Sequence, residues 1–128
     1  METLTLEDIL LSTKRAIAEM GSDYVYVRVP AEDDHFTDMV CRYFYEGQPS
    51  CIVGHIVEDL DLPHPPEGEA PNRMNDRLFA AGTNVRIETD GVAFLTYIQK
   101  HQDFGIPWGQ SYDLALEDVE RERGWGTE

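Results

Sequence analysis

The chain has 128 residues, of which 41% are hydrophobic and 27% are charged, and these values fit one globular domain rather than a disordered chain. Its 25 acidic residues outnumber its 10 basic residues, which gives a formal net charge of −15 at pH 7. This charge repels the phosphates of nucleic acids and of anionic membranes. It therefore argues against direct binding to either and favours a protein partner with a basic surface.

The first predicted element is a helix over residues 6–20. Thr5 and Asp8 have the spacing of a capping box at its start, and Gly21 can end it in the left-handed region. Between these ends, apolar residues recur at helical spacing: Leu6, Ile9, Leu10, Ile17 and Met20. We expect this apolar face to lie on the rest of the domain.

Two strands are expected next, over residues 24–29 and 39–45. In the first, valines alternate with larger side chains, and we expect Val25, Val27 and Val29 to face the core. A long connection joins the two strands, so an antiparallel pair is the economical arrangement.

A tight turn over residues 46–49 then leads into a helix for which Ser50 is the expected N-cap. The apolar stripe of this helix consists of Ile52, Val53, Ile56, Val57 and Leu60. Both cysteines of the chain, Cys41 and Cys51, bracket this corner of strand, turn and helix.

The region after this helix is rich in proline. Residues 61–73 contain four prolines and read as a surface loop that is either mobile or used for contacts. Beyond it, Asn75 is the expected cap of a short helix that runs through Ala81, and residues 85–87 could form a brief edge strand.

Two further helices complete the chain. The first is expected over residues 90–102, and the second begins at Pro107 and ends at Gly124. The second carries large and small apolar residues at helical spacing: Trp108, Tyr112, Ala115, Leu116 and Val119.

These elements predict a single small α+β domain over residues 1–128, with a two- or three-stranded antiparallel sheet packed by about four helices. No apolar run approaches the ~20 residues that a membrane span requires, and the N-terminus lacks the features of a signal peptide. Two cysteines do not make a disulfide scaffold, so we expect a cytoplasmic protein with reduced thiols. An open sheet edge would also allow a homodimer.

The most tempting chemical site combines Cys41, Cys51 and His55. Cys51 and His55 lie one turn apart on the predicted helix and would share a face, as two ligands of one metal ion do. Such a site would favour zinc, with His35 or His64 as the fourth ligand. The chain has no Cys-x-x-Cys pair, however, and free cysteines are often buried packing residues, so we prefer packing of the thiols and assign no metal or other cofactor.

The thiols have two further interpretations besides packing. A disulfide between Cys41 and Cys51 is sterically allowed across the corner, but a reducing cytoplasm opposes it. The positive end of a helix would favour a nucleophilic thiolate at Cys51, but His55 is poorly placed to act as its base.

The stretch over residues 99–109 is the second concentrated group of unusual residues. Gln102, Asp103 and Trp108 could form a polar and aromatic recognition patch. The glycine and proline between them also mark a corner between two helices, which Trp108 would anchor in the core. We favour the structural role and keep Gln102 and Asp103 as candidate interaction residues.

The acidic run Glu32, Asp33 and Asp34 is the other candidate contact surface. Such a run could gather a cation or face a basic partner, although charge runs are usually solvated and can serve solubility alone. The chain has no phosphate loop, dinucleotide fingerprint, zinc-protease helix or serine-hydrolase elbow, so no catalytic residue is assigned.

Two motifs together support a family resemblance. They are Cys41-x-Tyr43-x-x-x-Gly47-x-Pro49-Ser50-Cys51-Ile52-Val53-Gly54-His55 and Gln99-x-x-Gln102-Asp103-x-Gly105-x-x-Trp108. With both, the chain resembles a group of small uncharacterised proteins encoded by actinobacteriophages and prophages. The resemblance implies a phage-encoded protein that works inside a bacterial host, and it implies no activity for any residue here.

We therefore expect a non-enzymatic acidic protein that binds a host or phage protein. A sharper version is a DNA-mimicking inhibitor, whose carboxylates imitate phosphates toward a nucleic-acid-binding protein. The alternative from another class is a metal- or thiol-dependent enzyme that uses Cys51 and His55.

Overall fold

The computed structural model describes residues 2–27, 29–30, 39–40 and 42–127, with the backbone alone described at 29–30, 39–40 and 123–127. Within these residues, five α-helices and one 3-10 helix alternate with short strands. In chain order the elements are β1 (Glu2–Leu4), α1 (Leu6–Met20), β2 (Val29–Pro30), β3 (Met39–Val40), β4 (Phe44–Tyr45), β5 (Gln48–Pro49), α2 (Ile52–Asp59), η1 (Pro71–Arg73), α3 (Met74–Ala80), β6 (Val85–Ile87), α4 (Thr89–Asp103) and α5 (Trp108–Thr127). The fold is a small α+β fold, as predicted.

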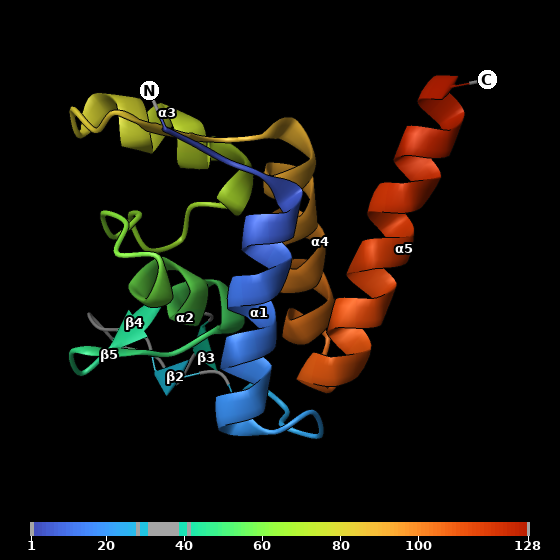
Figure 1. Ribbon diagram of the computed structural model, residues 1–128. Helices are drawn as coiled ribbons and strands as arrows, with labels where there is room; N and C mark the ends of the chain where they lie inside the picture. Colours follow the sequence, from blue (N-terminus) through green and yellow to red (C-terminus); the bar gives the residue numbers. More distant parts are fainter. Residues whose placement is uncertain (1, 28, 31–38, 41, 128) are drawn as a thin grey trace.

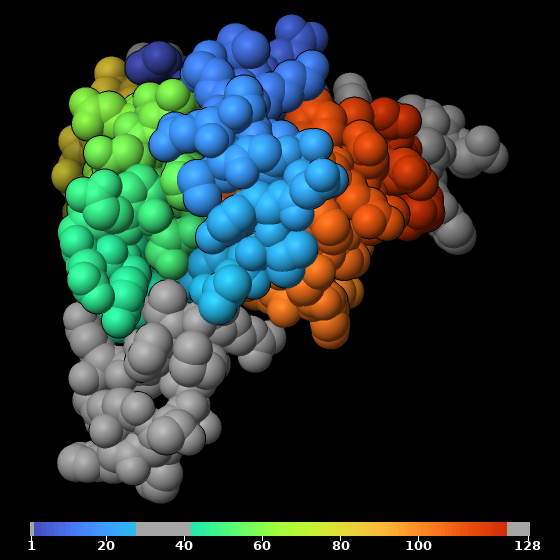
Figure 2. All heavy atoms as spheres, turned by 90° about the horizontal axis from the view of Figure 1, so that it is seen from below, coloured from blue at the N-terminus to red at the C-terminus, as the bar shows by residue number. Residues whose placement is uncertain are grey.

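The helices pack around α1 and α4. α4 makes its largest contact with α5, and α1 lies against both α2 and α4 (Figure 1). Seen from below, α1 lies between the green segment that contains α2 and the orange start of α5 (Figure 2). The interior between them is filled by fully buried side chains such as Ile9, Ile52, Phe94, Ile98 and Trp108.

The start of α1 has the predicted capping box. The backbone N–H of Asp8 donates to Thr5 Oγ1 at 3.2 Å, and the N–H of Thr5 donates to Asp8 Oδ2 at 2.9 Å. The helix ends at Gly21, which has a φ of 99°, a conformation that glycine adopts without strain.

The strands form three separate pairs rather than the single antiparallel sheet that the sequence predicts. The predicted antiparallel pairing of residues 24–29 with residues 39–45 is confirmed only where Val29 pairs with Val40. Residues 24–27 are not in a strand, and Phe44 and Tyr45 form β4, which pairs with β5 in a further antiparallel hairpin. β1 and β6 form a parallel pair in which Glu2 lies opposite Val85. The sequence analysis missed β1, since three residues are too few to show a pattern.

The prediction that the valines of residues 24–29 face the core is wrong for the two whose side chains are described. Val25 and Val27 are 40% and 69% exposed, whereas Tyr26 is 6% exposed. The Tyr26 hydroxyl accepts a hydrogen bond from the backbone N–H of Arg42 at 3.1 Å and shares another with the Ser50 hydroxyl at 3.2 Å. Tyr26 therefore points inward, where its hydroxyl finds hydrogen-bond partners, and Val25 and Val27 lie on the exposed side.

Both of the predicted N-caps at Ser50 and Asn75 are also wrong. Cys51 occupies the cap position of α2, while the Ser50 hydroxyl faces Tyr26. Asn75 lies inside α3, where its amide donates to the Ile87 carbonyl at 2.8 Å and its oxygen accepts from the Ile87 N–H at 2.7 Å. This two-point contact ties α3 to β6.

The proline-rich region is held against the body of the molecule. Residues 61–70 contain no helix or strand, as predicted, but Pro71 begins the 3-10 helix η1. The Glu67 carboxylate accepts hydrogen bonds from the backbone N–H groups of Tyr43 at 2.7 Å and Phe44 at 3.2 Å. The Tyr43 hydroxyl donates to the Glu69 carbonyl. The loop is therefore fixed to the strand β4 and the residue before it.

The last helix continues to Thr127, so the prediction that Gly124 ends it is wrong. A glycine inside a helix is less favourable than alanine by only about 1 kcal/mol, which does not stop a helix whose backbone conformation remains right-handed. None of the helices in the described part of the chain is long and apolar enough to cross a membrane.

Candidate functional site

The two motif stretches singled out in the sequence meet in space, at an interior corner where α2 begins and α4 turns into α5. The Gln102 side-chain oxygen accepts from the Ile52 backbone N–H and from the Trp108 indole N–H, both at 3.3 Å. The His55 ring meets the Trp108 ring edge-on, with 5.3 Å between the ring centroids. We call this group of Cys51, Ile52, His55, Gln102 and Trp108 the Gln102 corner.

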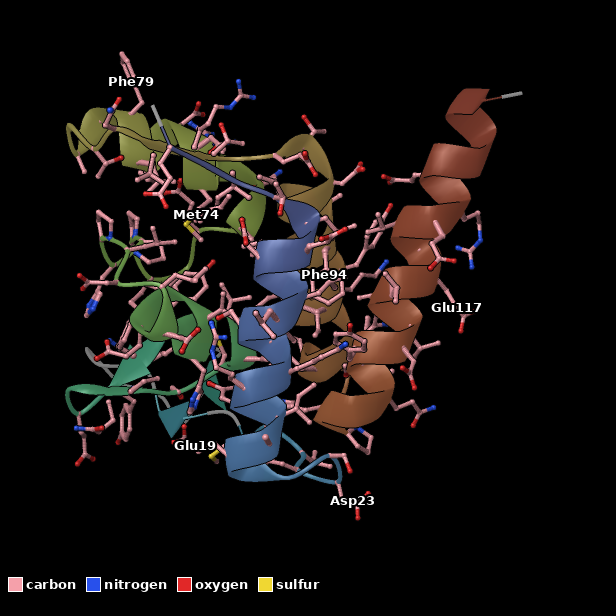
Figure 3. The ribbon with its side chains drawn as sticks, in the orientation of Figure 1. Glu19, Asp23, Met74, Phe79, Phe94 and Glu117 are labelled. Carbon is pink, nitrogen blue, oxygen red and sulfur yellow. The ribbon has the colours of Figure 1, made fainter. Side chains whose placement is uncertain are left out.

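The start of α5 is fixed to the loop that follows α1. The backbone N–H of Trp108 donates to the Tyr24 carbonyl at 2.8 Å, and that of Gly109 donates to the Ser22 carbonyl at 2.9 Å. A Cβ atom at residue 109 would lie 2.8 Å from the Ser22 Cβ, so this close approach requires glycine. Asp23 projects away from the body at the end of the same loop (Figure 3).

Residue 54, in the first motif, must also be glycine, and for a stronger steric reason. A Cβ atom on Gly54 would lie 1.9 Å from the backbone oxygen of Tyr43. The helix α2 can therefore lie directly on the backbone before β4 only because residue 54 has no side chain.

The Gln102 corner is buried except at His55, which is half-buried. Cys51 and Trp108 are fully buried, Cys51 is a free thiol, and Gln102 is 1% exposed. The favoured structural role is confirmed for Trp108, which lies in the core, while the candidate role of Gln102 as an interaction residue is wrong because its side chain is buried. Asp103 alone of the three reaches the surface, half-buried, and accepts from the Gln102 amide at 2.6 Å.

Of the histidines named as metal ligands, His55 is half-buried and its burial lowers its pKa, against a smaller raising effect of Glu19. His64 stacks on Phe44 with 3.7 Å between ring centroids. Cys41 and His35 lie outside the described residues. Among the residues that are described, no group of three or more His, Cys, Asp or Glu side chains could hold a metal ion.

The acidic run Glu32, Asp33 and Asp34 also lies outside the described residues. A second acidic surface, which the sequence analysis did not single out, lies on α5. Asp113, Glu117 and Glu120 are exposed and follow one another at spacings of four and three residues, so they form a single stripe, from which Glu117 points away from the body (Figure 3).

Much of the positive charge on the described surface is paired within the molecule. The ion pairs that involve arginine are Arg15–Asp59 at 2.7 Å, Arg73–Asp76 at 3.2 Å, Arg77–Glu69 at 2.7 Å and Arg121–Asp118 at 3.0 Å. Lys14 lies 5.9 Å from the centre of the Tyr112 ring. Arg121, which follows Glu120 on α5, is among these paired arginines.

One ion pair also connects two helices. The buried Ser12 hydroxyl of α1 donates to Asp59 of α2 at 2.7 Å, and Arg15 holds the same carboxylate. The hydrogen bond from Arg15 lowers the pKa of Asp59 below its ordinary value.

α4 and α5 are joined by two polar contacts on their outer side. His101 Nε2 lies 2.7 Å from Asp118 Oδ2, and the Tyr97 hydroxyl donates to Glu122. The hydrogen bond to Glu122 raises the pKa of Tyr97.

No protein-family model matches the chain, and neither a curated protein nor a solved structure matches it.

Proposed function

We propose that this protein is a non-enzymatic binder of another protein, and that its acidic exterior recognises a basic surface on that partner. The observation that carries the proposal is the formal net charge of −15, combined with arginines that are already paired with carboxylates. A field of one sign steers an oppositely charged partner into contact and raises the association rate.

The position of Cys51 favours binding over thiol chemistry. Among the described residues, Cys51 is fully buried at the start of α2, and Gln102 nearby accepts hydrogen bonds from the Ile52 and Trp108 N–H groups. A thiol nucleophile needs access and a base within reach, and the buried position of Cys51 supports a role in folding instead.

We further propose that the protein is encoded by a phage or prophage and acts in the cytoplasm of a bacterial host. This part rests on the resemblance of the motifs over residues 41–55 and 99–108 to small phage proteins. The partner would then be a host or phage protein with a basic surface.

A DNA-mimicking inhibitor is the second candidate, and the stripe of Asp113, Glu117 and Glu120 supports it. At about 1.5 Å of rise per residue the three carboxylates span about 10 Å of helix axis. One DNA strand carries a charge about every 3.4 Å, so the stripe is a sparser row of the same sign.

The test is affinity capture from lysate of an actinobacterial host, followed by mass spectrometry at low and high salt. We expect capture of a basic protein that weakens steeply as salt rises, because surface charges are screened. Capture that is indifferent to salt would contradict the acidic surface as the recognition element.

A matched pair of variants locates the surface. D113N/E117Q/E120Q removes three charges from the stripe on α5, and E2Q/E7Q/E46Q removes three from exposed positions elsewhere. If the protein mimics DNA through α5, the first variant loses capture and the second retains most of it. Equal losses would indicate that the net charge matters and the stripe does not.

A further inference from the structure

A cavity of about 380 Å³ lies along α4, which separates η1 and the start of α3 from the later part of α5 at this point. We call it the Glu122 cavity, and the residues of its lining that matter below are Asn72, Thr89, Val92, Ala93, Tyr97 and Glu122. Ligand pockets in proteins usually measure about 300–1,000 Å³ and combine apolar walls with a few polar groups. The Glu122 cavity has both features.

The floor of the cavity is one face of α4. Thr89, Ala93 and Tyr97 follow one another at spacings of four residues, so they lie on the same side of the helix, with Val92 beside them. Val92, Ala93 and Tyr97 are half-buried and pack against the core, which fixes their positions. The floor is therefore apolar and already in place, with the Tyr97 ring as its aromatic part.

The charge at this cavity is the carboxylate of Glu122, an exposed residue of α5. Its Oε1 atom accepts a hydrogen bond from the neutral hydroxyl of Tyr97. In the part of the chain that the structure describes, no basic side chain is paired with Glu122, and its Oε2 atom accepts no hydrogen bond. Arg121, the preceding residue, is paired with Asp118 at 3.0 Å. The Glu122 carboxylate therefore offers a ligand both a negative charge and an acceptor atom.

Two exposed polar residues on the lining add further acceptors. Asn72 contributes a side-chain amide oxygen and Thr89 a hydroxyl. The cavity thus combines an apolar floor, an aromatic ring, one carboxylate and two neutral acceptors. This set suits a cation that has an apolar stem and several N–H donors.

We propose that the Glu122 cavity binds an arginine side chain of a protein partner. The methylene groups would pack on Val92 and Ala93, and the guanidinium would lie against the Tyr97 ring while it donates to the Glu122 carboxylate. Arginine fits better than lysine, because its planar group both stacks on a ring and has five N–H donors for several acceptors. The inference rests on the proposed function for the existence of a basic partner, and it names the surface that one arginine of this partner occupies.

The test is a titration of the ¹⁵N-labelled full chain with N-acetyl-arginine amide, followed by NMR. We expect shifts that saturate at the backbone amides of Asn72, Ala93, Tyr97 and Glu122. N-acetyl-citrulline amide has nearly the same shape without the charge, and N-acetyl-lysine amide has the charge without the planar group. Both should bind more weakly than the arginine compound at these amides.

The variant E122Q removes the charge and keeps an oxygen that can accept from the Tyr97 hydroxyl. It should weaken binding of the arginine compound about tenfold, because charge-assisted hydrogen bonds are about twice as strong as neutral ones. E117Q is the matched control, since it removes one exposed carboxylate from the same helix at a residue that does not line the cavity. Equal binding of citrulline or lysine, equal effects of E122Q and E117Q, or shifts spread over the acidic surface would each overturn the proposal.

The same variants separate this inference from the proposed function. If salt-sensitive capture of a basic protein is found and E122Q captures as much of it as the unmutated protein does, the inference about the cavity fails although the proposed function stands. If the arginine compound binds at the Glu122 cavity and no protein is captured, the site stands and the proposed function fails.

Discussion

Gln102 and Asp103 are consecutive residues at the end of α4, and they belong to two regions of opposite character. Gln102 is buried at the corner, where its side-chain oxygen holds the amide of Ile52 and the indole of Trp108. Asp103 is half-buried and accepts a hydrogen bond from Gln102. With Pro71 and Phe104 it lines a cavity of about 480 Å³. The last turn of α4 thus supplies both a buried hydrogen-bond acceptor, Gln102, and a charged residue at the surface, Asp103.

The difference shows how polar residues that are adjacent in a motif can have separate roles. A buried amide whose partners are buried N–H groups stabilises the fold and leaves nothing for a ligand. Asp103 instead has its charge at a half-buried position on the lining of the cavity. Mutations at the corner should therefore change stability more than mutations at Asp103.

The largest expected effect is at Gly54, on the corner side of this comparison. Gly54→Ala would place a methyl group 1.9 Å from the Tyr43 backbone oxygen. This clash can be relieved only if the backbone of α2 or the backbone at Tyr43 shifts. We expect a loss of about 3 kcal/mol in the free energy of unfolding, measured by urea denaturation. A midpoint unchanged from that of the unmutated protein would show that α2 and the segment before β4 are not in direct contact.

The next largest effect compares the two neighbours directly. Gln102→Met removes the shared acceptor and leaves two buried donors unsatisfied, which should cost about 2 kcal/mol in the free energy of unfolding. Asp103→Asn keeps an acceptor at a half-exposed position and should change stability by no more than about 0.5 kcal/mol. Similar losses for both variants in urea denaturation would remove the distinction between corner and cavity.

A smaller effect is expected at Asp59, whose carboxylate joins the buried Ser12 to the exposed Arg15. The pKa of Asp59 is lowered from its ordinary value of 3.8, so its contribution to stability is present above pH 3.8 and is lost as the pH falls through the folded-state pKa. Asp59→Asn should cost about 0.5–1 kcal/mol at neutral pH.

The check is urea denaturation of both proteins from neutral pH down to acid conditions. The difference between them should narrow as Asp59 is protonated, because the variant has no carboxylate to lose at this position. A constant difference at every pH would mean that the hydrogen bonds of Asp59 do not depend on its charge.

The smallest effect concerns His55, at the edge of the corner. Burial lowers its pKa from 6.5, so the unfolded chain binds more protons than the folded chain between pH 6.5 and the folded-state pKa. Stability should therefore fall as the pH drops through this window. His55→Phe keeps a ring against Trp108 and removes the titration, so its unfolding midpoint should depend less on pH, and identical pH profiles would contradict this account.

The sequence predicted the long helices well, because the apolar periodicity of α1, α4 and α5 reports a buried face directly. It failed at residues 24–29, since alternation reveals two faces without saying which is buried, and the hydrogen-bond partners of Tyr26 made that choice. It also failed at Ser50, which is a good N-cap by type but is engaged elsewhere.

The candidate site was also predicted only in part from the sequence. Both motif stretches were recognised from residue types, yet the meeting of Ile52 and Gln102 depends on how α2 packs on α4, which local spacing does not encode. The cavity beside Asp103 was missed because one of its walls was interpreted only as a loop. The helical spacing of Thr96, Gln99, Lys100 and Asp103, which line the cavity from α4, was the available signal.

The helix α1 is held at both ends by parts of the chain that are made much later. At its start, Leu6 donates to the Glu88 carboxylate and β1 pairs with β6, and just past its end the Tyr24 carbonyl accepts from the N–H of Trp108. A nascent chain on the ribosome therefore has to release α5 before α1 can take its final position. Folding should therefore be completed only after α5 has emerged from the ribosome, with closure of these long loops as the slow step.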